Sequence, residues 1–565
     1  MKNIVLFCDG TGNSSRSRDK TNVWRMYRAL NQHRPSKQVC TYGDGVGTSE
    51  FKPFKVLGGA LGFGLKRDVI ELYKYLCQNY EDGDRIYLFG FSRGGFTVRL
   101  LAGIIAKYGV YKQYDDFDEL EKQAGLMFRR YRFECGETKG APKSEPKLFR
   151  GGRGLLFKLL KPFSQFEDVE VLRPDIEFIG VWDTVDAYGL PIDELTLAWD
   201  FFIYPLRFPD QNLNPKIKKA CHAVSVDDER HTFHPVLWNE EHEKDDRIEQ
   251  VWFSGVHADI GGGYSMGDLS LVSLEWMVSK VDQSQNGGKG LHFIDSVRDE
   301  LAASSNWHGV HHDSRAGFAA YYRYKPRDID ALCNDHEKGV FIKTPKIHQS
   351  VFRRIKQKVV PYAPTALPET YEMYGGKDDF ETDAEKTARN DALEYARDTI
   401  YWRRWVYVAL VLTTLYLAAF PWLPYGEAPS GGTCEGSACL LAPIFDGLAR
   451  FLPDFLGPWL NALKLNAVAQ HGFIAAFVLL VLLQVWLAKR TRQQAYAAWA
   501  ALKGRGAPPK WTPTWTSKLR SCFKLSTKIF YKWIVSALFL IAVGCGMYWG
   551  LVALYQHFVT TVLNA

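Results

Sequence analysis

Short apolar runs and amphipathic segments alternate through the first half of the chain. The apolar runs have the length of buried strands and fall at residues 3–8, 38–42, 86–89, 175–182, 219–226 and 250–256. Apolar residues at helical spacing lie between and after them, at residues 21–30, 66–79, 96–105, 119–133 and 269–281. Strand and helix in alternation are typical of parallel strands joined by crossover helices. The pattern therefore predicts an α/β fold with a mostly parallel sheet and flanking helices.

The pattern changes near residue 400, where long apolar runs alternate with basic segments. Three runs contain no charged residue and lie near 405–423, 472–488 and 533–555. A helix that crosses a bilayer needs about 20 predominantly apolar residues. We therefore predict an α-helical transmembrane region over residues 401–565 with three spans. A fourth apolar segment, 439–463, carries charges and is expected at the membrane interface.

The basic residues suggest how these spans are oriented. Residues 489–532 hold eleven Lys or Arg and no Asp or Glu, whereas residues 424–470 hold two basic and four acidic residues. Because basic segments stay on the cytoplasmic side, residues 1–400 and 489–532 are expected there, with 424–470 outside. Cys434 and Cys439 in the outer segment are candidates for a disulfide, and the scattered remaining cysteines are expected as free thiols.

A glycine-rich corner joins the third apolar run to the helix that follows it. It spells Gly90-Phe91-Ser92-Arg93-Gly94, which is G-x-S-x-G. In α/β-hydrolases such a turn exposes the serine hydroxyl, and its glycines let strand and helix approach closely. A serine oxygen becomes a good nucleophile when a neighbouring base accepts its proton. The corner therefore predicts an α/β-hydrolase-like sheet with Ser92 as nucleophile; an incidental serine in a glycine-rich turn is the alternative.

Two further residues at strand ends complete a candidate triad in the chain order Ser, Asp, His. Asp183 directly follows the run 175–182, and Asp186 is the alternative acid three residues later. His257 follows the run 250–256. Catalytic groups of parallel sheets gather at the carboxyl ends of the strands, so the three side chains are expected to meet there. Other histidines lie in less regular surroundings and receive no catalytic role: His222, His231, His234 and His242.

The tetrahedral oxyanion formed on an ester carbonyl needs converging N–H donors. The residue after the nucleophile supplies one of these donors, so we expect the backbone N–H of Arg93 in this role. The glycine loop after the first apolar run supplies another, from Gly10 or Thr11. The expected cycle is attack by Ser92, formation of an acyl-serine, and its hydrolysis by water that His257 activates. This chemistry needs no metal and no cofactor.

As a set, these motifs resemble the bacterial type VI secretion lipase-effector family. The motifs that carry the resemblance lie at residues 6–13, 45–48, 90–94, 180–185, 225–230 and 251–264. The resemblance covers about residues 1–350 and implies an α/β-hydrolase with phospholipase A activity and the triad Ser92, Asp183 and His257. The C-terminal tail is not covered by it. Two locations follow: a multi-pass protein of the bacterial inner membrane, or an effector delivered into a target cell.

At 565 residues the chain is too long for a single core. We predict a catalytic domain over 1–365 with 112–174 as an insertion or cap, a polar helical connector over 366–400, and then the membrane region. The expected function is a membrane-anchored serine hydrolase on glycerophospholipid acyl esters, of phospholipase A or lysophospholipase type. The alternatives are an esterase on other esters and a non-catalytic scaffold or pore-forming protein. The expected partners are a phospholipid membrane and a regulatory or immunity protein, without nucleic acid.

Overall fold

The computed structural model describes two compact units. The described residues are 1–11, 13–45, 63–137, 171–186, 211–243, 246–284, 290–357, 361–376, 380–420, isolated positions between 443 and 461, and 472–522. Of the described residues, one unit holds Met1–Lys386 and Cys522, and the other holds Thr387–Ser521. The domain limits predicted from the sequence stay predictions.

The first unit is built on an eight-stranded sheet in which all neighbouring strands are parallel. Across the sheet the order is β10-β9-β8-β7-β6-β3-β1-β2. The strands are β1 (Asn3–Cys8), β2 (Gln38–Gly43), β3 (Arg85–Phe91), β6 (Ile176–Trp182), β7 (Ala220–Ser225), β8 (Ile248–Phe253), β9 (Lys346–His348) and β10 (Glu372–Tyr374). A separate antiparallel pair is formed by β4 (Val110–Tyr111) and β5 (Val171–Leu172). The predicted α/β class is confirmed.

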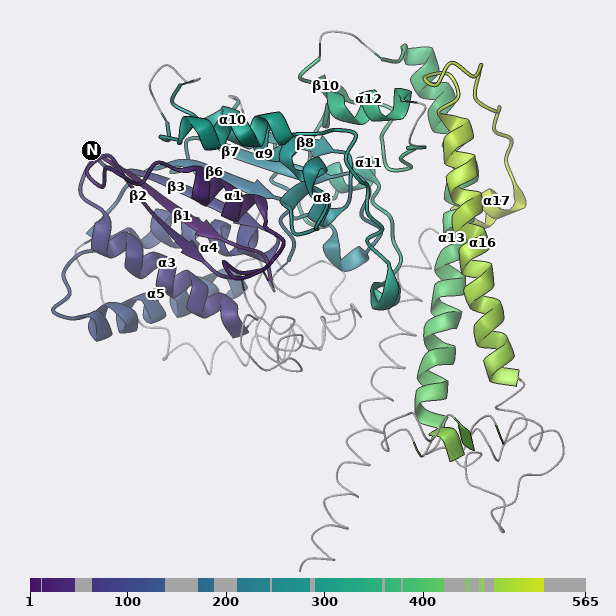
Figure 1. Ribbon diagram of the computed structural model, residues 1–565, viewed down its shortest axis with the longest axis horizontal. Coiled ribbons are helices and arrows are strands. Elements are labelled where there is room, and N and C mark those ends of the chain that lie inside the picture. Colours follow the sequence, from purple (N-terminus) through teal and green to yellow (C-terminus); the bar gives the residue numbers. More distant parts are fainter. Residues whose placement is uncertain are drawn as a thin grey trace, which may run out of the picture. The chain divides into compact units, whose positions relative to one another are not determined.

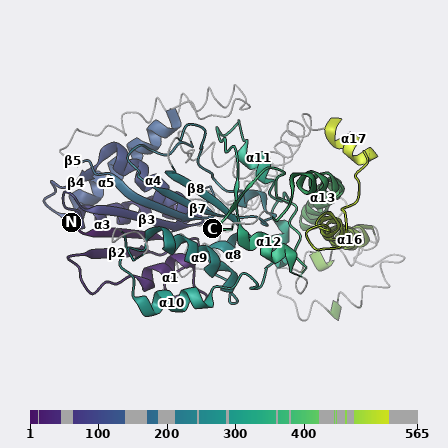
Figure 2. The ribbon, with the colours of Figure 1, turned by 90° about the horizontal axis from the view of Figure 1, so that it is seen from above.

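Helices cover both faces of this sheet (Figure 1, Figure 2). One layer contains α3 (Phe63–Asn79), α4 (Arg93–Tyr108) and α5 (Phe117–Glu137), and the other contains α1 (Asn22–Ala29), α9 (Asp268–Val281) and α10 (Asp295–Ser304). Successive strand residues point to opposite faces. In β1, Ile4 and Leu6 pack in the core under the first layer, and Val5 and Phe7 pack in the core under the second. Strands buried on both faces therefore read as continuous apolar runs.

The sequence pattern locates most of these elements to within a few residues. Helix α1 begins after Thr21, which caps it, since Thr21 Oγ1 accepts the Trp24 N–H at 3.2 Å. Of the predicted insertion 112–174, the described helix α5 packs on α3 and α4 as part of a helical layer. The short elements outside the main pattern are α8 (His257–Gly261), α11 (Ile329–Cys333), α12 (Gln349–Lys356) and the 3-10 helices η2 (His231–Phe233) and η3 (Gly317–Tyr321).

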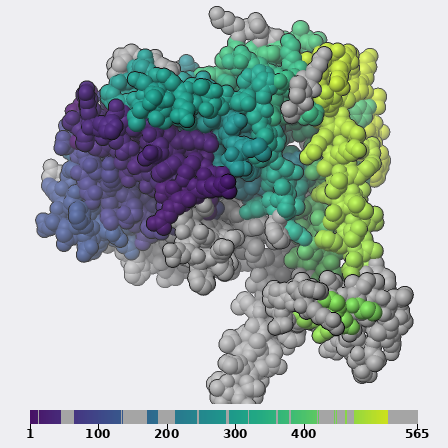
Figure 3. All heavy atoms as spheres, in the orientation of Figure 1, coloured from purple at the N-terminus to yellow at the C-terminus, as the bar shows by residue number. Residues whose placement is uncertain are grey.

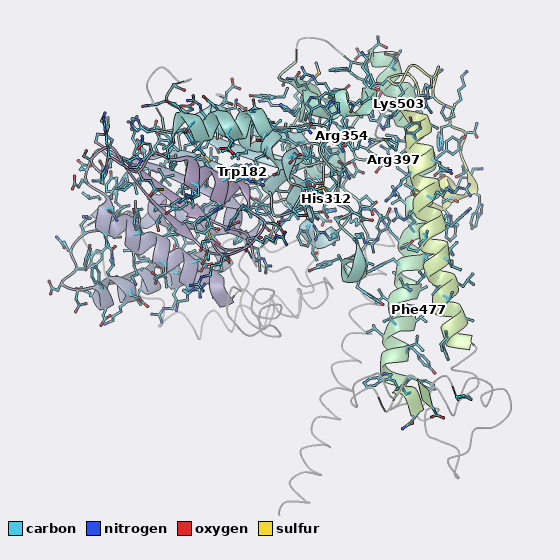
Figure 4. All side chains as sticks on the ribbon, in the orientation of Figure 1. Trp182, His312, Arg354, Arg397, Phe477 and Lys503 are labelled. Atoms are coloured by element: carbon cyan, nitrogen blue, oxygen red, sulfur yellow. The ribbon has the colours of Figure 1, made fainter. Side chains whose placement is uncertain are left out.

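The second unit is a helical hairpin. Helices α13 (Asp383–Ala419) and α16 (Ile474–Ala498) run side by side in opposite directions, and α17 (Trp515–Cys522) follows (Figure 1). Tyr416 and Phe473 stack at one end with ring centroids 4.2 Å apart. Towards the other end, Thr399 Oγ1 donates to Gln494 Oε1 at 2.6 Å. Figure 4 labels Phe477 in the first of these regions and Arg397 in the second.

One helix in the described part of the chain, α16, has the length and apolar composition needed to cross a membrane. It contains residues 474–488 of the predicted span 472–488 and continues to Ala498. Of the predicted span 405–423, residues 405–419 lie in α13, and 533–555 falls outside the described residues together with Cys434 and Cys439. The predicted region of three spans is therefore not shown, and a multi-pass location in the inner membrane is not supported.

Candidate active site

The carboxyl ends of neighbouring strands bring the candidate residues to one rim of the sheet. Asp9, Ser92 and Asp183 directly follow β1, β3 and β6, and His257 comes four residues after the end of β8. The parallel register aligns these strand ends. Trp182, the last residue of β6, marks the rim in Figure 4.

Ser92 stands at a strained corner between β3 and α4. Its φ is +57° and its ψ is −124°, a conformation that residues with a side chain rarely adopt. A Cβ on Gly90 would collide with the backbone of Gly94, and one on Gly94 with the backbone at the end of β1. Ser92 also immediately precedes the first turn of α4, whose dipole favours negative charge. The corner therefore has the geometry of a nucleophile elbow.

His257 lies between Ser92 and Asp183. Its Nε2 is 2.8 Å from Ser92 Oγ, and its Nδ1 is 2.6 Å from Asp183 Oδ2. The rings of Phe91 and Phe233 flank the imidazole at centroid distances of 4.7 and 4.9 Å. Burial lowers the pKa of His257 more than the bond and charge of Asp183 raise it. A neutral imidazole that donates from Nδ1 leaves Nε2 free to accept the Ser92 proton.

A buried arginine holds Asp183, and the sequence pattern did not indicate it. Arg327 donates from Nη1 to Oδ1 at 2.7 Å and from Nη2 to Oδ2 at 2.8 Å. The same two nitrogens donate to the carbonyl oxygens of Ser225 and Phe233, and the Ser225 N–H donates to Asp183 Oδ1 at 2.9 Å. Burial alone would raise the pKa of Asp183, but the Arg327 charge and the bonds from His257 and Arg327 hold it well below its ordinary value. Asp183 is therefore ionised at neutral pH.

The alternative residues occupy other positions. Asp186 is exposed and, within the described part of the chain, makes no hydrogen bond to His257. His222 is buried, accepts the Thr184 N–H at 3.1 Å, and has its pKa lowered to about 3 by burial. Of the other histidines without a predicted catalytic role, His231 and His234 pack against each other with centroids 5.0 Å apart, and the His242 side chain is 84% exposed.

Three carboxylates hold the turn that carries His257. Asp228 accepts the His257 N–H at 3.2 Å and pairs with Arg230 at 2.7 Å. Asp227 and Asp259 accept backbone N–H groups from the turn, and each contacts a histidine from a later segment: Asp227 with His311 at 3.1 Å and Asp259 with His312 at 2.6 Å. Among the described residues, no group of three or more His, Cys, Asp or Glu is arranged to hold a metal ion.

The candidate oxyanion donors differ in their availability. Gly10 lies beside the nucleophile, since a Cβ on it would be 3.1 Å from Ser92 Cβ, but its N–H donates to Asp9 Oδ1 at 2.6 Å. Within the described residues, the N–H groups of Thr11 and Arg93 donate no hydrogen bond. Thr11 and Arg93 are therefore better placed than Gly10 to bind an oxyanion through their backbones.

Asp9 orients the glycine loop through hydrogen bonds to its carboxylate. Its Oδ2 accepts the hydroxyl groups of Thr21 and Tyr42, both at 2.5 Å, while Oδ1 accepts the Gly10 N–H. Burial raises the pKa of Asp9 to about 6, and these three donors offset part of the effect. The sequence marked Asp9 only as part of a glycine-rich loop, so its role in holding that loop comes from the structure.

A serine, an imidazole and a carboxylate in hydrogen-bonded sequence at the carboxyl rim of a parallel α/β sheet form the arrangement typical of serine ester hydrolases. Residues 2–280, which contain all three, match the model of the family described as "T6SS, Phospholipase effector Tle1-like, catalytic domain". The family expected from the motifs is confirmed over this part of the chain. The description of this family names a phospholipase effector.

Two individual proteins are also similar to the chain. An uncharacterized protein of Saccharomyces cerevisiae is 28% identical over 245 residues, which are 41% of this chain. The chain covers 32% of that relative, about a third of its length. A solved structure of an uncharacterized protein from Pseudomonas aeruginosa matches with a TM-score of 0.30 and 16% identity, over 89% of this chain and 66% of that one. Neither name states an activity.

Proposed function

We propose that the protein is a membrane-anchored serine hydrolase that cleaves acyl esters of glycerophospholipids, as a phospholipase A or lysophospholipase. The observation that carries the proposal is the hydrogen-bonded series Ser92–His257–Asp183. The match of residues 2–280 to a phospholipase effector domain supports the substrate class.

In the proposed reaction, His257 Nε2 takes the proton of Ser92 as Oγ attacks the ester carbonyl carbon. The backbone N–H groups of Arg93 and Thr11 bind the resulting oxyanion. Collapse expels the glycerol oxygen, which receives the proton from His257, and leaves an acyl-serine. Water deprotonated by the same imidazole then releases the fatty acid. Asp183 fixes the imidazole tautomer and stabilises the imidazolium, while Arg327 keeps Asp183 ionised.

Membrane anchoring is proposed for α16. Leu479, Leu482 and Val485 on this helix are 65%, 61% and 64% exposed, and α16 forms much of the surface drawn for the second unit in Figure 3. Leaving apolar surface in water instead of burying it costs roughly 25 cal/mol of free energy per Å², so a lipid environment would stabilise this face. A basic end, residues 489–492, follows the apolar stretch, as at a cytoplasmic boundary. The family's description as an effector supports delivery into a target cell.

The test is mass spectrometry of lipids from cells that express the wild type or Ser92→Ala. Free fatty acid is expected to rise only with the wild type, together with a rise in lysophospholipid for a phospholipase A and a fall in lysophospholipid for a lysophospholipase. His257→Ala should resemble Ser92→Ala, whereas His242→Ala, which changes a histidine that is 84% exposed, should resemble the wild type. An unchanged effect of the Ser92→Ala protein on cells would favour a non-catalytic scaffold.

The substrate class is tested with purified protein. Phospholipid vesicles and short uncharged acyl esters are offered separately, and release of fatty acid is measured. Cleavage of both is expected for a phospholipase with an accessible serine. Cleavage of the short esters alone would replace the proposed substrate with a non-phospholipid ester.

A further inference from the structure

The side chain next to the nucleophile ends in an unpaired charge. Arg93 is the first residue of α4, and its Nη1 is buried without a hydrogen-bond acceptor among the described residues. Burial lowers the pKa of Arg93 to about 10, and the group that counteracts this shift is Tyr322 rather than a carboxylate. A buried charge without a partner costs free energy, so buried arginines are ordinarily paired.

The other arginines at this rim follow the ordinary rule. Arg327 forms two bonds to Asp183, and Arg230 is paired with Asp228 at 2.7 Å. Among the described residues around the site, Arg93 is the arginine that has no such anion. A ligand that brings an anionic group would supply the missing partner.

The surroundings of Arg93 connect it to the catalytic imidazole. Tyr322, which acts electrostatically on Arg93, packs edge-to-face on Phe233 with centroids 5.5 Å apart, and Phe233 packs in the same way on His257 at 4.9 Å. Arg93 also directly follows Ser92, and consecutive Cα atoms lie about 3.8 Å apart. The distance between the guanidinium and the attacking oxygen therefore cannot exceed the combined reach of two adjacent side chains.

We propose that the Arg93 guanidinium binds the phosphodiester group of the phospholipid headgroup and so selects phospholipids over uncharged esters. Only a few bonds separate an acyl carbonyl carbon from phosphorus in a glycerophospholipid, which matches the reach of a side chain adjacent to the nucleophile. A guanidinium binds two phosphate oxygens through parallel N–H···O bonds, whereas a lysine acts as a point charge. This assignment rests on the proposed phospholipase function and concerns the side chain, not the backbone N–H.

The kinetic test compares the wild type, Arg93→Met and Arg93→Lys on a phospholipid and on an uncharged acyl ester dispersed in the same neutral detergent. The ratio of kcat/KM for the two substrates is expected to shift against phospholipid by tenfold to a hundredfold in Arg93→Met, and by less in Arg93→Lys. Arg85→Met, at the opposite end of β3, is the matched control and should keep the wild-type ratio. An unchanged ratio in Arg93→Met would overturn the proposal.

A binding test separates this assignment from the proposed function. The Ser92→Ala protein and the Ser92→Ala, Arg93→Met protein are titrated with a non-hydrolysable ether phospholipid and with inorganic phosphate. Loss of ether-lipid affinity in the double variant is expected, and equal affinity would refute the headgroup contact whether or not the wild type hydrolyses phospholipid. Inorganic phosphate that binds at Arg93 as tightly as the lipid would point to a free-anion site and would also overturn it.

Stability provides a further readout, because it distinguishes a ligand contact from a structural one. Removal of a partly buried charge whose Nη1 has no partner should leave the thermal unfolding midpoint of Arg93→Met unchanged or higher. A lowered midpoint together with an equal loss of both activities would show that Arg93 supports the fold instead.

Discussion

Asp183 combines two features that are costly by themselves, complete burial and a φ of +37°. The conformation persists because Arg327 holds both carboxylate oxygens and two backbone carbonyl oxygens, one at the end of β7 and one at the end of η2. An ion pair buried to this extent is not stabilising in itself, since both charges have lost their hydration. Its value lies in fixing the carboxylate that orients His257.

Removal of the Arg327 charge should therefore damage both folding and catalysis. In Arg327→Met the Asp183 charge is left buried and uncompensated, which should lower the free energy of unfolding by about 3–5 kcal/mol. The pKa of Asp183 should rise towards neutrality, and kcat should fall by roughly 10²–10⁴ because the imidazole loses its orienting anion. Denaturant unfolding and initial rates measure the two effects.

Arg327→Lys is the matched variant for that experiment. It keeps the charge but cannot form two parallel bonds, so intermediate losses in stability and rate are expected. Wild-type stability and rate in Arg327→Met would show that Asp183 does not depend on this arginine.

The pH dependence of the reaction follows from the lowered pKa of His257. The base acts when neutral, so kcat/KM should stay high as the pH falls and decline with a midpoint below about 6.5, the ordinary value for histidine. The same shift predicts a loss of stability as the pH falls through that ordinary value, because the unfolded chain then binds the proton more readily than the folded one.

Asp9 titrates in the same pH range, so its contribution to the pH profile must be separated from that of His257. Asp9 has its pKa raised to about 6, so the profile is measured for the wild type and for Asp9→Asn. The part of the acidic decline that persists in Asp9→Asn belongs to His257. A midpoint above 6.5 in that variant would contradict the assignment of a base whose pKa is lowered by burial.

Among the elements, those with many apolar positions were predictable and the shortest were not. Strand β1 is apolar throughout after Asn3, and β6 and β8 are mostly apolar, because helices cover both faces of the sheet. The edge strand β10 and its neighbour β9 have three residues each, too few for a periodic pattern.

The site residues likewise divide into those that a local sequence pattern predicts and one that it does not. Once the strands are parallel, their carboxyl ends must meet, so Ser92, Asp183 and His257 could be inferred from their places after strands. Arg327 reaches Asp183 from 144 positions away in a segment without periodicity. No local pattern specifies such a contact, because it depends on how a loop folds over the rim.

The boundary predicted at residue 400 shows that amino-acid composition does not by itself predict where a helix ends. Helix α13 is 37 residues long and continues through this position without interruption. Its first part belongs to the predicted polar connector and its last part to the predicted first span. A change in composition therefore marked a change of environment along one helix and not an end of an element.

At the scale of the whole molecule, the chemistry and the apolar helix lie in separate compact units. Ser92, Asp183 and His257 belong to Met1–Lys386, whereas α16 belongs to Thr387–Ser521. A change that abolishes membrane binding through α16 should therefore leave the hydrolytic site intact. This separation allows the anchoring proposal to be tested independently of catalysis.

The test replaces Leu479, Leu482 and Val485 with Asp in the full chain. An aspartate near the middle of a membrane-spanning helix costs about 3 kcal/mol on insertion scales, so three of them should prevent insertion of α16. Carbonate extraction of membranes should release the triple variant and retain the wild type and Gln493→Asp, an exposed position on the same helix beyond the apolar stretch. Hydrolysis of detergent-dispersed phospholipid should persist, because the substrate no longer has to be reached in a bilayer. A triple variant that resists extraction as the wild type does would mean that another part of the chain holds the protein in the membrane, and the assignment to α16 would be wrong.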